Sequence, residues 1–362
     1  MSLSVVIAGG GTGGHLYPGI AVARELLSRH PDATVTFVGT AAGIESRVMP
    51  REGLPLDVIR SAGLKGTSVG AFVRGLALLP ISAFDAWRVL SRRRPSVVIG
   101  VGGYSSGPVL LLAALRGIPT LLMEQNAVPG FTNRSLARVV DAAAVTYRES
   151  VSVFGDRAFV SGNPVRSAFF RCEETHEPRG VPPGAARVLV FGGSQGAHAI
   201  NVAMVEAAPR LAAAAPRVAV THQTGERDLA MVRDAYRRAG LEARVEPFLF
   251  AMDREMNDAD LVVCRAGATT LAELTAARRP AILVPLPTAT DDHQRRNADA
   301  LVAAGAALMV EQHALTGTRL ADEIVALAAD VARRGRMRQA AGALARPDAA
   351  RVIVDRVLSL AR

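Results

Sequence analysis

The sequence predicts an α/β protein with two Rossmann-like parallel sheets, one in each half of the chain. Two glycine-rich turns, at residues 9–15 and 192–198, each follow a short apolar run and precede an alanine-rich stretch. Strand and helix patterns alternate before Pro164 and again after it. The 362 residues also exceed the length at which a single core usually keeps growing. Two domains with nucleotide or pyrophosphate chemistry in the cleft between them are therefore expected.

The strands are expected where short apolar runs contain β-branched residues, as in buried parallel sheets. These runs are residues 4–8, 34–38, 96–101, 120–123, 187–191, 218–222, 261–264 and 281–285. Helical patterns follow at residues 19–29, 105–116, 197–214 and 270–277.

The domain boundary is expected near residues 162–166, which separates residues 1–163 from 164–341. Prolines and polar residues at 173–184 indicate a linker or an early loop of the second domain. The amphipathic helix of about 342–362 can pack back on the first domain.

The composition bears on the compartment of the protein and on whether it spans a membrane. The two cysteines, Cys172 and Cys264, cannot form a disulfide framework, which favours a reducing compartment. Residues 1–8 lack the positive charge of a signal peptide, and no stretch approaches 18 apolar residues, so no membrane span is expected.

The net charge of +9 is concentrated in one segment. Lys65 is the sole lysine, so part of the charge reflects an arginine-rich composition. Between residues 60 and 94, seven basic residues stand against Asp85 alone, and 7 minus 1 gives +6. The basic residues are Arg60, Lys65, Arg74, Arg88, Arg92, Arg93 and Arg94. Few aromatics lie among them, which favours lipid headgroups over nucleic acid.

The same segment carries a stripe of large apolar residues, interrupted by Pro80 and followed by the arginines. The stripe consists of Phe72, Leu76, Leu79, Phe84, Trp87 and Leu90. Such a pattern is typical of a surface that docks on an anionic membrane leaflet. A core-facing helix with a solvated basic end fits the pattern equally well.

The first glycine turn has the Gly9-x-Gly11-x-x-Gly14 spacing of a dinucleotide-binding fingerprint. The acidic residue that would hold the ribose after the second strand is missing, because Gly39 and Thr40 stand there. An oxidoreductase is therefore disfavoured. A turn that only permits close strand–helix packing is the alternative.

His15 follows this turn at the expected start of a helix. The helix dipole there favours a neutral imidazole, which is the form that a general base needs. A hydrogen-bonded structural histidine is the alternative.

Two further segments follow strands in the first half. Residues 100–107 form a third glycine turn, with hydroxyls at Tyr104, Ser105 and Ser106 that can donate to phosphate or sugar oxygens or cap a helix. Glu124, Gln125 and Asn126 lie at the carboxyl end of a predicted strand, where ligands of parallel sheets gather. A solvated turn is the alternative for these three.

In the second half, the segment from Arg265 places small residues before a helix that begins with Thr269 and Thr270. Its main-chain N–H groups can hold a diphosphate, and Glu273 can accept hydrogen bonds from ribose hydroxyls. A capping box formed by Thr270 and Glu273 is the alternative.

The polar cluster of residues 291–297 allows either a metal site or a sugar site. Because the glycine turns and helix dipoles already supply the positive field that a diphosphate requires, we expect no metal and no other cofactor. Recognition of sugar hydroxyls by His293 and Gln294 fits better.

Together these segments resemble the MurG family, peripheral membrane glycosyltransferases that make lipid II by adding N-acetylglucosamine (GlcNAc) to lipid I. The resemblance runs along essentially the whole chain. It is carried by residues 9–15 with 18–19, 102–107, 124–126, 162–166, 192–196, 264–273 and 291–297.

The resemblance implies a GT-B fold, with the lipid-linked acceptor in the first domain and UDP-GlcNAc in the second. In the second domain it implies diphosphate contacts, backbone contacts to uracil, and contacts to the ribose and the sugar. The diphosphate would be contacted by Ser194, Ala268, Thr269 and Thr270. The backbone of Leu249 would contact uracil, Glu273 would contact the ribose, and Gln294 would contact the sugar. Thr12, Gly13, Gly14, Asn126 and Arg166 would complete the donor site across the cleft.

One departure from the family's pattern bears on the mechanism. Met123 stands where the family often has a histidine, so we expect His15, supported by Glu124, to be the base of an inverting transfer that forms a β-1,4 linkage. The expected location is the cytoplasmic face of the cell membrane, where other cell-wall synthesis proteins are candidate partners. A different glycosyltransferase, a UDP-GlcNAc epimerase and a nucleotide-responsive membrane protein remain alternatives.

Overall fold

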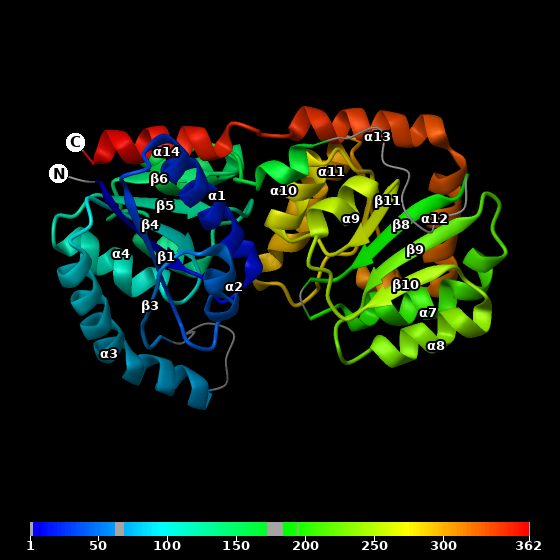
Figure 1. The fold of residues 1–362 in the computed structure, drawn as a ribbon, viewed down its shortest axis with the longest axis horizontal. Coiled ribbons are helices and arrows are strands. Elements are labelled where there is room, and N and C mark those ends of the chain that lie inside the picture. Colours follow the sequence, from blue (N-terminus) through cyan, green and yellow to red (C-terminus); the bar gives the residue numbers. More distant parts are fainter. Residues whose placement is uncertain (1–2, 62–68, 172–183, 194, 362) are drawn as a thin grey trace. The chain divides into compact units, whose positions relative to one another are not determined.

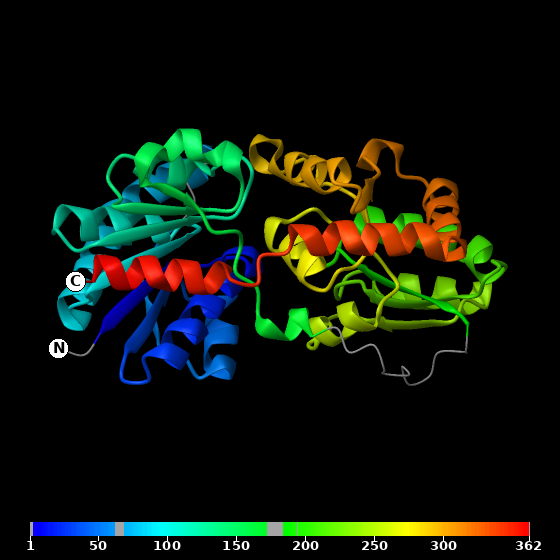
Figure 2. The same cartoon turned by 90° about the horizontal axis from the view of Figure 1, so that it is seen from above.

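A computed structural model describes residues 3–61, 69–171, 184–193 and 195–361, with only the backbone at 69–77. The chain divides into two compact units, each drawn in Figures 1 and 2. Unit 1 comprises Met1–Arg166 and Arg346–Arg362, and unit 2 comprises Ser167–Ala345. Lys65, Cys172, Ser194 and nearly all of the expected linker at 173–184 lie outside the described residues.

Unit 1 contains a seven-stranded sheet in the order β3-β2-β1-β4-β5-β6-β7, with every neighbouring pair parallel. Its strands are β1 (Ser4–Gly9), β2 (Thr34–Gly39), β3 (Leu56–Val58), β4 (Val97–Gly102), β5 (Thr120–Glu124), β6 (Ala142–Val145) and β7 (Ala158–Val160). The strand order reverses between β1 and β4, which is the place where open parallel sheets bind ligands.

Helices cover both faces of this sheet (Figure 1). They are α1 (Gly13–Arg29), α2 (Glu45–Glu52), α3 (Val69–Arg93), α4 (Ser106–Leu115), α5 (Phe131–Leu136), α6 (Val151–Phe154) and α14 (Ala349–Leu360). The 3-10 turns are η1 (Arg148–Ser150) and η2 (Gly155–Arg157). Alternate residues of β1 explain the two cores, because Val5 and Ile7 pack with α1 and α14 while Val6 and Ala8 pack with α3 and α4.

Unit 2 contains a six-stranded sheet in the order β10-β9-β8-β11-β12-β13, again with parallel neighbours. Its strands are β8 (Ala186–Phe191), β9 (Val218–Gln223), β10 (Ala243–Glu246), β11 (Leu261–Cys264), β12 (Ala281–Leu283) and β13 (Ala307–Met309). The order reverses between β8 and β11, so unit 2 repeats the topology of unit 1. The prediction of two Rossmann-like parallel sheets is confirmed.

The helices of unit 2 also lie on both sides of its sheet (Figure 2). They are α7 (His198–Ala212), α8 (Leu229–Ala239), α9 (Met252–Asp258), α10 (Ala268–Ala276), α11 (His293–Ala303), α12 (Gly317–Ala329) and α13 (Val331–Leu344). The 3-10 turns are η3 (Ser167–Phe170), η4 (Thr290–Asp292) and η5 (Gln312–Ala314). The core cluster joins Val188 and Val190 of β8 to apolar residues of α7 and α12.

Two expectations at prolines are corrected. The helical pattern at 19–29 belongs to a helix that begins at Gly13, near the start expected at His15, and that contains Pro18. The segment expected to be broken at Pro80 is one continuous helix, α3. A proline removes one backbone hydrogen bond and crowds the preceding turn, which packing on a neighbour can offset. Both helices have such a neighbour, since α1 packs on α14 and α3 packs on α4. Among the described residues no helix is both long and apolar enough to cross a membrane.

Candidate functional site

The first and third glycine turns of unit 1 pack backbone to backbone. Gly9, Gly10 and Gly11 have φ angles of 144°, 145° and 80°, which other residues rarely adopt. A Cβ on Gly9 would lie 2.3 Å from the Gly102 carbonyl oxygen, and one on Gly103 would lie 2.4 Å from the Gly10 oxygen. The contact follows from the pairing of β1 with β4. The glycines are therefore needed both for the turns and for their mutual approach.

A buried glutamate that the sequence did not reveal supports the first turn. Glu45, fully buried at the start of α2, accepts hydrogen bonds from the Gly11 N–H (2.8 Å) and the Thr40 N–H (2.7 Å). The Thr40 hydroxyl donates a third at 3.1 Å. Its carboxyl also fills the space beside Gly10, where a Cβ would lie 2.6 Å away. A carboxylate therefore stands behind the first glycine turn and occupies one of its N–H groups.

His15 lies at the start of α1, where Thr12 is the extended N-cap residue. Its Nδ1 is 3.2 Å from the Thr12 hydroxyl oxygen, and its ring lies against Gly102 at the end of β4. If Nδ1 carries the proton and donates it to Thr12, Nε2 is the ring nitrogen that can accept a proton from a substrate. The geometry thus provides a means of setting the tautomer that a base at His15 requires.

Glu124 is not a solvent-facing side chain. It is 2% exposed, and its oxygens accept hydrogen bonds from the Asn126 N–H and side-chain amide, the Gly130 N–H and the Asn133 amide. Burial raises the pKa of Glu124, although these hydrogen bonds oppose the rise. Gln125 is also buried and donates to the Val101 carbonyl at 3.1 Å. The expectation that all three side chains of this segment face a ligand is therefore wrong, and Asn126 alone is partly exposed.

The hydroxyls expected after β4 are mostly internal as well. Ser105 and Ser106 are buried, and no side chain caps the start of α4. Tyr104 is 55% exposed and is the member of the segment that can reach a ligand. Elsewhere in unit 1, the Arg166 guanidinium carbon lies 5.0 Å from the centre of the Tyr17 ring, a distance typical of a cation–π contact.

In unit 2 the second glycine turn also makes close backbone contacts. A Cβ on Gly196 would lie 1.8 Å from the Thr224 carbonyl oxygen, and one on Gly225 would lie 2.1 Å from the Gln195 oxygen. The turn after β8 is thus pressed against the turn after β9. The predicted diphosphate residue Ser194 lies outside the described residues, and α7 begins after Ala197 with no side-chain cap.

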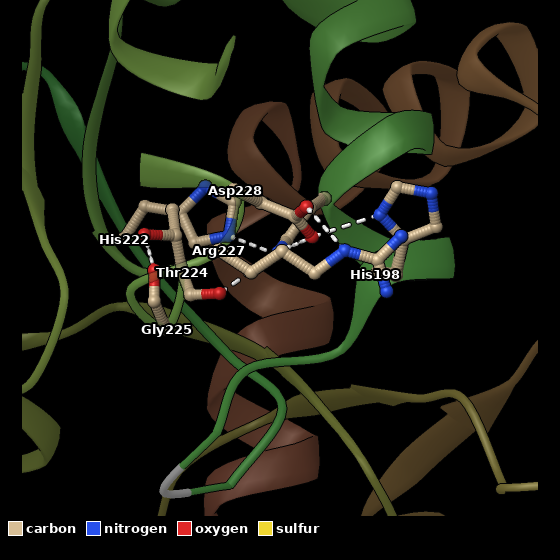
Figure 3. Close-up of polar contacts among 7 residues, drawn as sticks. His198, His222, Thr224, Gly225, Arg227 and Asp228 are labelled. Atoms are coloured by element: carbon tan, nitrogen blue, oxygen red, sulfur yellow. Dashed lines mark hydrogen bonds and ion pairs between the residues drawn. The ribbon is translucent and has the colours of Figure 1, made fainter. Parts of the chain in front are cut away.

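A hydrogen-bond network that includes the Asp228 carboxylate holds the turn after β9 (Figure 3). The Asn201 amide donates to the Thr224 carbonyl (2.9 Å) and to the Asp228 carboxylate (2.8 Å), which also contacts His198 Nδ1 at 2.9 Å. His222 Nε2 is 3.0 Å from the Asn201 amide oxygen. Since the Asn201 amide uses its N–H groups elsewhere, its oxygen must accept, and His222 Nε2 must carry the proton.

His222 is therefore a structural residue rather than a base. Its Nδ1 accepts from the Tyr236 hydroxyl at 2.7 Å, and the side chain is fully buried. Burial lowers the pKa of His222 to about 3. Burial alone would oppose ionisation of Asp228, but hydrogen bonds from Asn201 and His198 keep the pKa of Asp228 below its ordinary value.

The start of α10 excludes the capping-box alternative. The helix begins at Ala268 with Gly267 as its N-cap, and no side chain caps it. Thr270 is then the third helical residue rather than the cap, so Thr270 and Glu273 do not form a capping box. The N-terminal N–H groups of a helix capped in this way favour an anion. Glu273 lies on the same helix, largely buried at 9% exposure.

Arg265 has an internal role. Its guanidinium donates to the carbonyls of Val284 and Pro285, each at 3.1 Å, and to the Gln312 side-chain oxygen at 2.7 Å. Burial lowers its pKa. These bonds tie the end of β11 to the end of β12, so Arg265 positions the turn before α10.

The segment before α11 is strained at two residues. Asp291 and Asp292 both have φ of 54°, a conformation that few residues other than glycine adopt. Next to them the Gln294 oxygen accepts the Leu286 N–H at 3.0 Å, and His293 is partly exposed. Across the described ranges, no group of three or more histidine, cysteine or acidic side chains has the arrangement of a metal site.

A separate surface of unit 1 exposes large apolar side chains on two neighbouring helices, α3 and α4. We call it the α3–α4 face: Leu79, Phe84, Trp87, Leu111 and Leu115, which are 39%, 55%, 51%, 44% and 75% exposed. Phe84 stacks on Trp87 with ring centres 6.3 Å apart. The opposite side of α3, through Ala86, Val89 and Leu90, packs in the core. The backbone of Phe72 and Leu76 lies in α3, but their side chains are outside the described structure.

Two of the arginines expected on this face are paired. Arg92 contacts Asp57 at 2.7 Å, and Arg93 makes two hydrogen bonds to the same carboxylate. Burial opposes ionisation of Asp57, but these hydrogen bonds hold its pKa below the ordinary value. The charge estimate from the sequence omitted Asp57, which precedes the segment that was counted. Arg88, which lies over the Phe84 ring at 6.0 Å, and Arg94 are exposed.

The sequences of both units match a known family of enzymes. Residues 5–145 match the glycosyltransferase family 28 N-terminal domain, and residues 187–353 match the glycosyltransferase family 28 C-terminal domain. The chain therefore belongs to glycosyltransferase family 28, and its two Rossmann-like units are those of the GT-B fold.

Within this family the chain is similar to MurG proteins. It is 49% identical to the UDP-N-acetylglucosamine–N-acetylmuramyl-(pentapeptide) pyrophosphoryl-undecaprenol N-acetylglucosamine transferase of Anaeromyxobacter sp. (strain Fw109-5), over 99% of this chain and 94% of that protein. The protein of the same name from Pelobacter propionicus is 48% identical over 99% of both chains. The crystal structure of Acinetobacter baumannii MurG matches with a TM-score of 0.76 and 30% identity, covering 99% of each chain. The resemblance inferred from the sequence is confirmed.

Proposed function

We propose that this protein transfers GlcNAc from UDP-GlcNAc to the 4-hydroxyl of N-acetylmuramic acid in lipid I, which is undecaprenyl-pyrophosphoryl-N-acetylmuramyl-pentapeptide, and so makes lipid II for peptidoglycan. The observation that carries the proposal is the near 50% identity, along almost the whole chain, to relatives named for this reaction. The uncapped helix starts and glycine turns of unit 2 support it, because they are suited to a nucleoside diphosphate.

In the proposed reaction His15 is the general base. Its Nε2 removes the proton of the acceptor hydroxyl while Nδ1 donates to Thr12. The hydroxyl oxygen bonds to the anomeric carbon as the bond to the UDP oxygen breaks, which inverts the configuration and gives the β-1,4 linkage. Glu124 supports the site through the turn it holds, since it orients both the backbone and the side chain of Asn126.

The donor is held in unit 2. Main-chain N–H groups at Ser194 and at Ala268, Thr269 and Thr270 stabilise the charge that develops on the diphosphate, a contribution that is usually large in catalysis. Glu273 accepts hydrogen bonds from the ribose, Leu249 contacts uracil through its backbone, and His293 and Gln294 contact the sugar. In unit 1, Thr12, Gly13, Gly14, Tyr104, Asn126 and Arg166 are the proposed binding residues.

The protein is further proposed to lie peripherally on the anionic cytoplasmic surface of the membrane through the α3–α4 face. The exposed Leu79, Phe84 and Trp87 would enter the headgroup boundary, and the exposed Arg88 and Arg94 would contact lipid phosphates. Of the other residues predicted for this surface, Phe72 and Leu76 extend α3, and Arg92 and Arg93 contribute less net charge because they share Asp57.

Incubation with radiolabelled UDP-GlcNAc and lipid I, with and without a chelator, tests the function. We expect label in lipid II and equal rates in both conditions. If the labelled UDP-GlcNAc is instead epimerised in the absence of lipid, the chain is an epimerase. If the protein binds lipid but does not consume UDP-GlcNAc, it is a non-enzymatic membrane protein.

Replacement of Leu79 and Trp87 by serine tests the membrane proposal. The double variant should leave vesicles of phosphatidylglycerol at least about 10-fold more readily than the unaltered protein, because it loses apolar area in the headgroup region. Transfer to a soluble acceptor analogue should be unchanged. The matched control, Val331→Ser, removes an apolar side chain that is 69% exposed on α13 and should not affect vesicle binding. Equal vesicle binding by the double variant would show that docking uses another surface.

A further inference from the structure

Gln223 connects the two segments of unit 2 that the proposed donor site uses at opposite ends of the nucleotide. It is the last residue of β9 and is 2% exposed. Its side-chain N–H donates to the Gly193 carbonyl at 2.8 Å, and its side-chain oxygen accepts the Leu249 N–H at 2.8 Å. One side-chain amide therefore bridges the glycine turn after β8 and the segment after β10.

The position of β9 in the sheet explains the bridge. β9 lies between β8 and β10, and Gln223 pairs with Phe191 on one side and with Glu246 on the other. The segments that leave these two strands pass on either side of Gln223. Because all three strands are parallel, both segments emerge at the carboxyl edge of the sheet, where ligands bind.

We propose that Gln223 is a positioning residue for the nucleotide, which sets the spacing between the diphosphate-binding turn at Gly193 and the uracil-binding segment at Leu249. The inference rests on the donor site proposed above. A uridine diphosphate must engage both segments together, so fixing their separation before binding lowers the conformational entropy lost on binding.

The chemistry of the side chain suits this role. The bridge needs one donor and one acceptor at a fixed separation, which a primary amide provides. A glutamate would lack the donor for the Gly193 carbonyl, and an asparagine is one methylene shorter and could not reach both partners. Further hydrogen bonds hold the turn after β9 against the end of β10. The Thr224 N–H donates to the Glu246 carbonyl at 3.0 Å, and the Gly225 N–H donates to the Pro247 carbonyl at 3.1 Å.

A buried glutamine could also act only on stability, so the test compares ligands of different length. Uridine engages the Leu249 segment alone, whereas UDP engages both segments. Loss of a residue that couples the segments should therefore weaken the binding of UDP more than the binding of uridine. A general loss of stability would reduce the folded fraction and would change both apparent affinities by the same factor.

The first variant is Gln223→Met, which removes both hydrogen bonds without adding charge. The UDP dissociation constant, measured by isothermal titration calorimetry, should rise about 10- to 100-fold, and the uridine constant, measured by NMR titration, should rise at least about 10-fold less. In transfer assays the KM for UDP-GlcNAc should rise in parallel while kcat stays within about 3-fold. Equal weakening of both ligands, or none, would overturn the proposal.

Two additional variants make the outcome decisive. Gln223→Asn keeps a neutral amide that is too short to bridge, and it should show the same selective loss of UDP affinity even where Gln223→Met does not fold. Asn257→Leu is the matched control, because it removes a side-chain amide that donates to the Ala168 carbonyl at 3.1 Å elsewhere in unit 2. It should leave both affinities unchanged.

The unaltered protein separates this inference from the proposed function. If the unaltered chain neither binds UDP nor transfers GlcNAc, the donor site itself is refuted. If it does both and the Gln223 variants bind UDP and uridine in the original ratio, only the positioning role of Gln223 is refuted.

Discussion

The two glycine turns share a sequence pattern and a position in their sheets, but different groups support them from behind. In unit 1 the Glu45 carboxylate accepts the Gly11 N–H and fills the space beside Gly10. In unit 2 the Gln223 amide donates to the Gly193 carbonyl. The acidic group in unit 1 thus accepts a main-chain N–H of its turn. In unit 2 the main-chain contact comes from a neutral amide on a carbonyl, and the acidic Asp228 contacts the side chains of His198 and Asn201.

The difference bears on what each turn can bind. A carboxylate close behind a turn lowers the local potential, so it opposes a second anion in front and favours a positive charge nearby. A neutral amide on a carbonyl takes up no N–H group of the turn and adds no negative charge behind it. The second turn is therefore better suited to the departing diphosphate, and the first to the proton transfer at His15, where an imidazolium forms.

The idea of two equivalent pyrophosphate cradles, which the sequence pattern favours, needs revision on this ground. Both turns have the same strand–turn–helix order and contain glycines with positive φ angles. Only the side chains behind them, which come from distant parts of the chain, distinguish their electrostatics.

The largest expected effect is that of His15→Ala. Loss of a general base should lower kcat by about 10²- to 10⁴-fold, while the KM for UDP-GlcNAc changes little because the donor is held in unit 2. Steady-state kinetics with lipid I measures both. His30→Ala, at the far end of the same helix, is the control and should have normal activity. Unchanged turnover of the His15 variant would contradict the assignment of His15 as the base. The first turn would then have no role in proton transfer that distinguishes it from the second.

Glu45→Gln tests the support of the first turn directly. The replacement amide places an N–H group against the N–H of Gly11 or Thr40, and a buried donor left unpaired costs about 1–3 kcal/mol. We expect kcat to fall about 10-fold, with the KM for UDP-GlcNAc unchanged, because the turn carries His15. The control is Glu52→Gln at the other end of α2. It alters a surface ion pair with Arg24 of α1 and should be neutral. A rise in KM without a loss of kcat would show that the first turn serves the donor instead.

The sequence was sufficient for the fold because strand and turn patterns are local. Runs such as residues 4–8 and 187–191 are apolar and β-branched, and each is followed at once by glycines. The strands that were missed are short: β3, β7 and β13 have three residues and β6 and β10 have four, which are too few positions to show a period.

The support of the site could not be predicted in the same way. Glu45 lies 34 residues from Gly11, and Gln223 lies 30 residues from Gly193. Neither belongs to a glycine pattern, and a polar residue after a strand is as often a solvated turn. Glu124 shows the converse error, since a carboxylate placed by the sequence at a ligand edge is instead enclosed by its own loop.

The remaining expected effect is on stability rather than on turnover, and it concerns the turn after β9. His222 has a pKa of about 3 in the folded state against 6.5 for the ordinary side chain. Below pH 6.5 the unfolded state binds more protons than the folded state, so stability falls with decreasing pH, by up to about 1.4 kcal/mol per pH unit, until the pH reaches the folded pKa. Hydrogen exchange of β9 and α8 peptides at several pH values measures this dependence.

His222→Gln isolates the contribution of the histidine. The amide does not titrate and can still donate to the Asn201 oxygen, so opening of β9 should become less dependent on pH between 6.5 and about 4. Asp228 stabilises the folded state until the pH falls through its lowered pKa. This contribution is present in both the variant and the unaltered protein. A steep pH dependence that persists in the variant would mean that another group that ionises in this range, and not His222, controls the opening of β9.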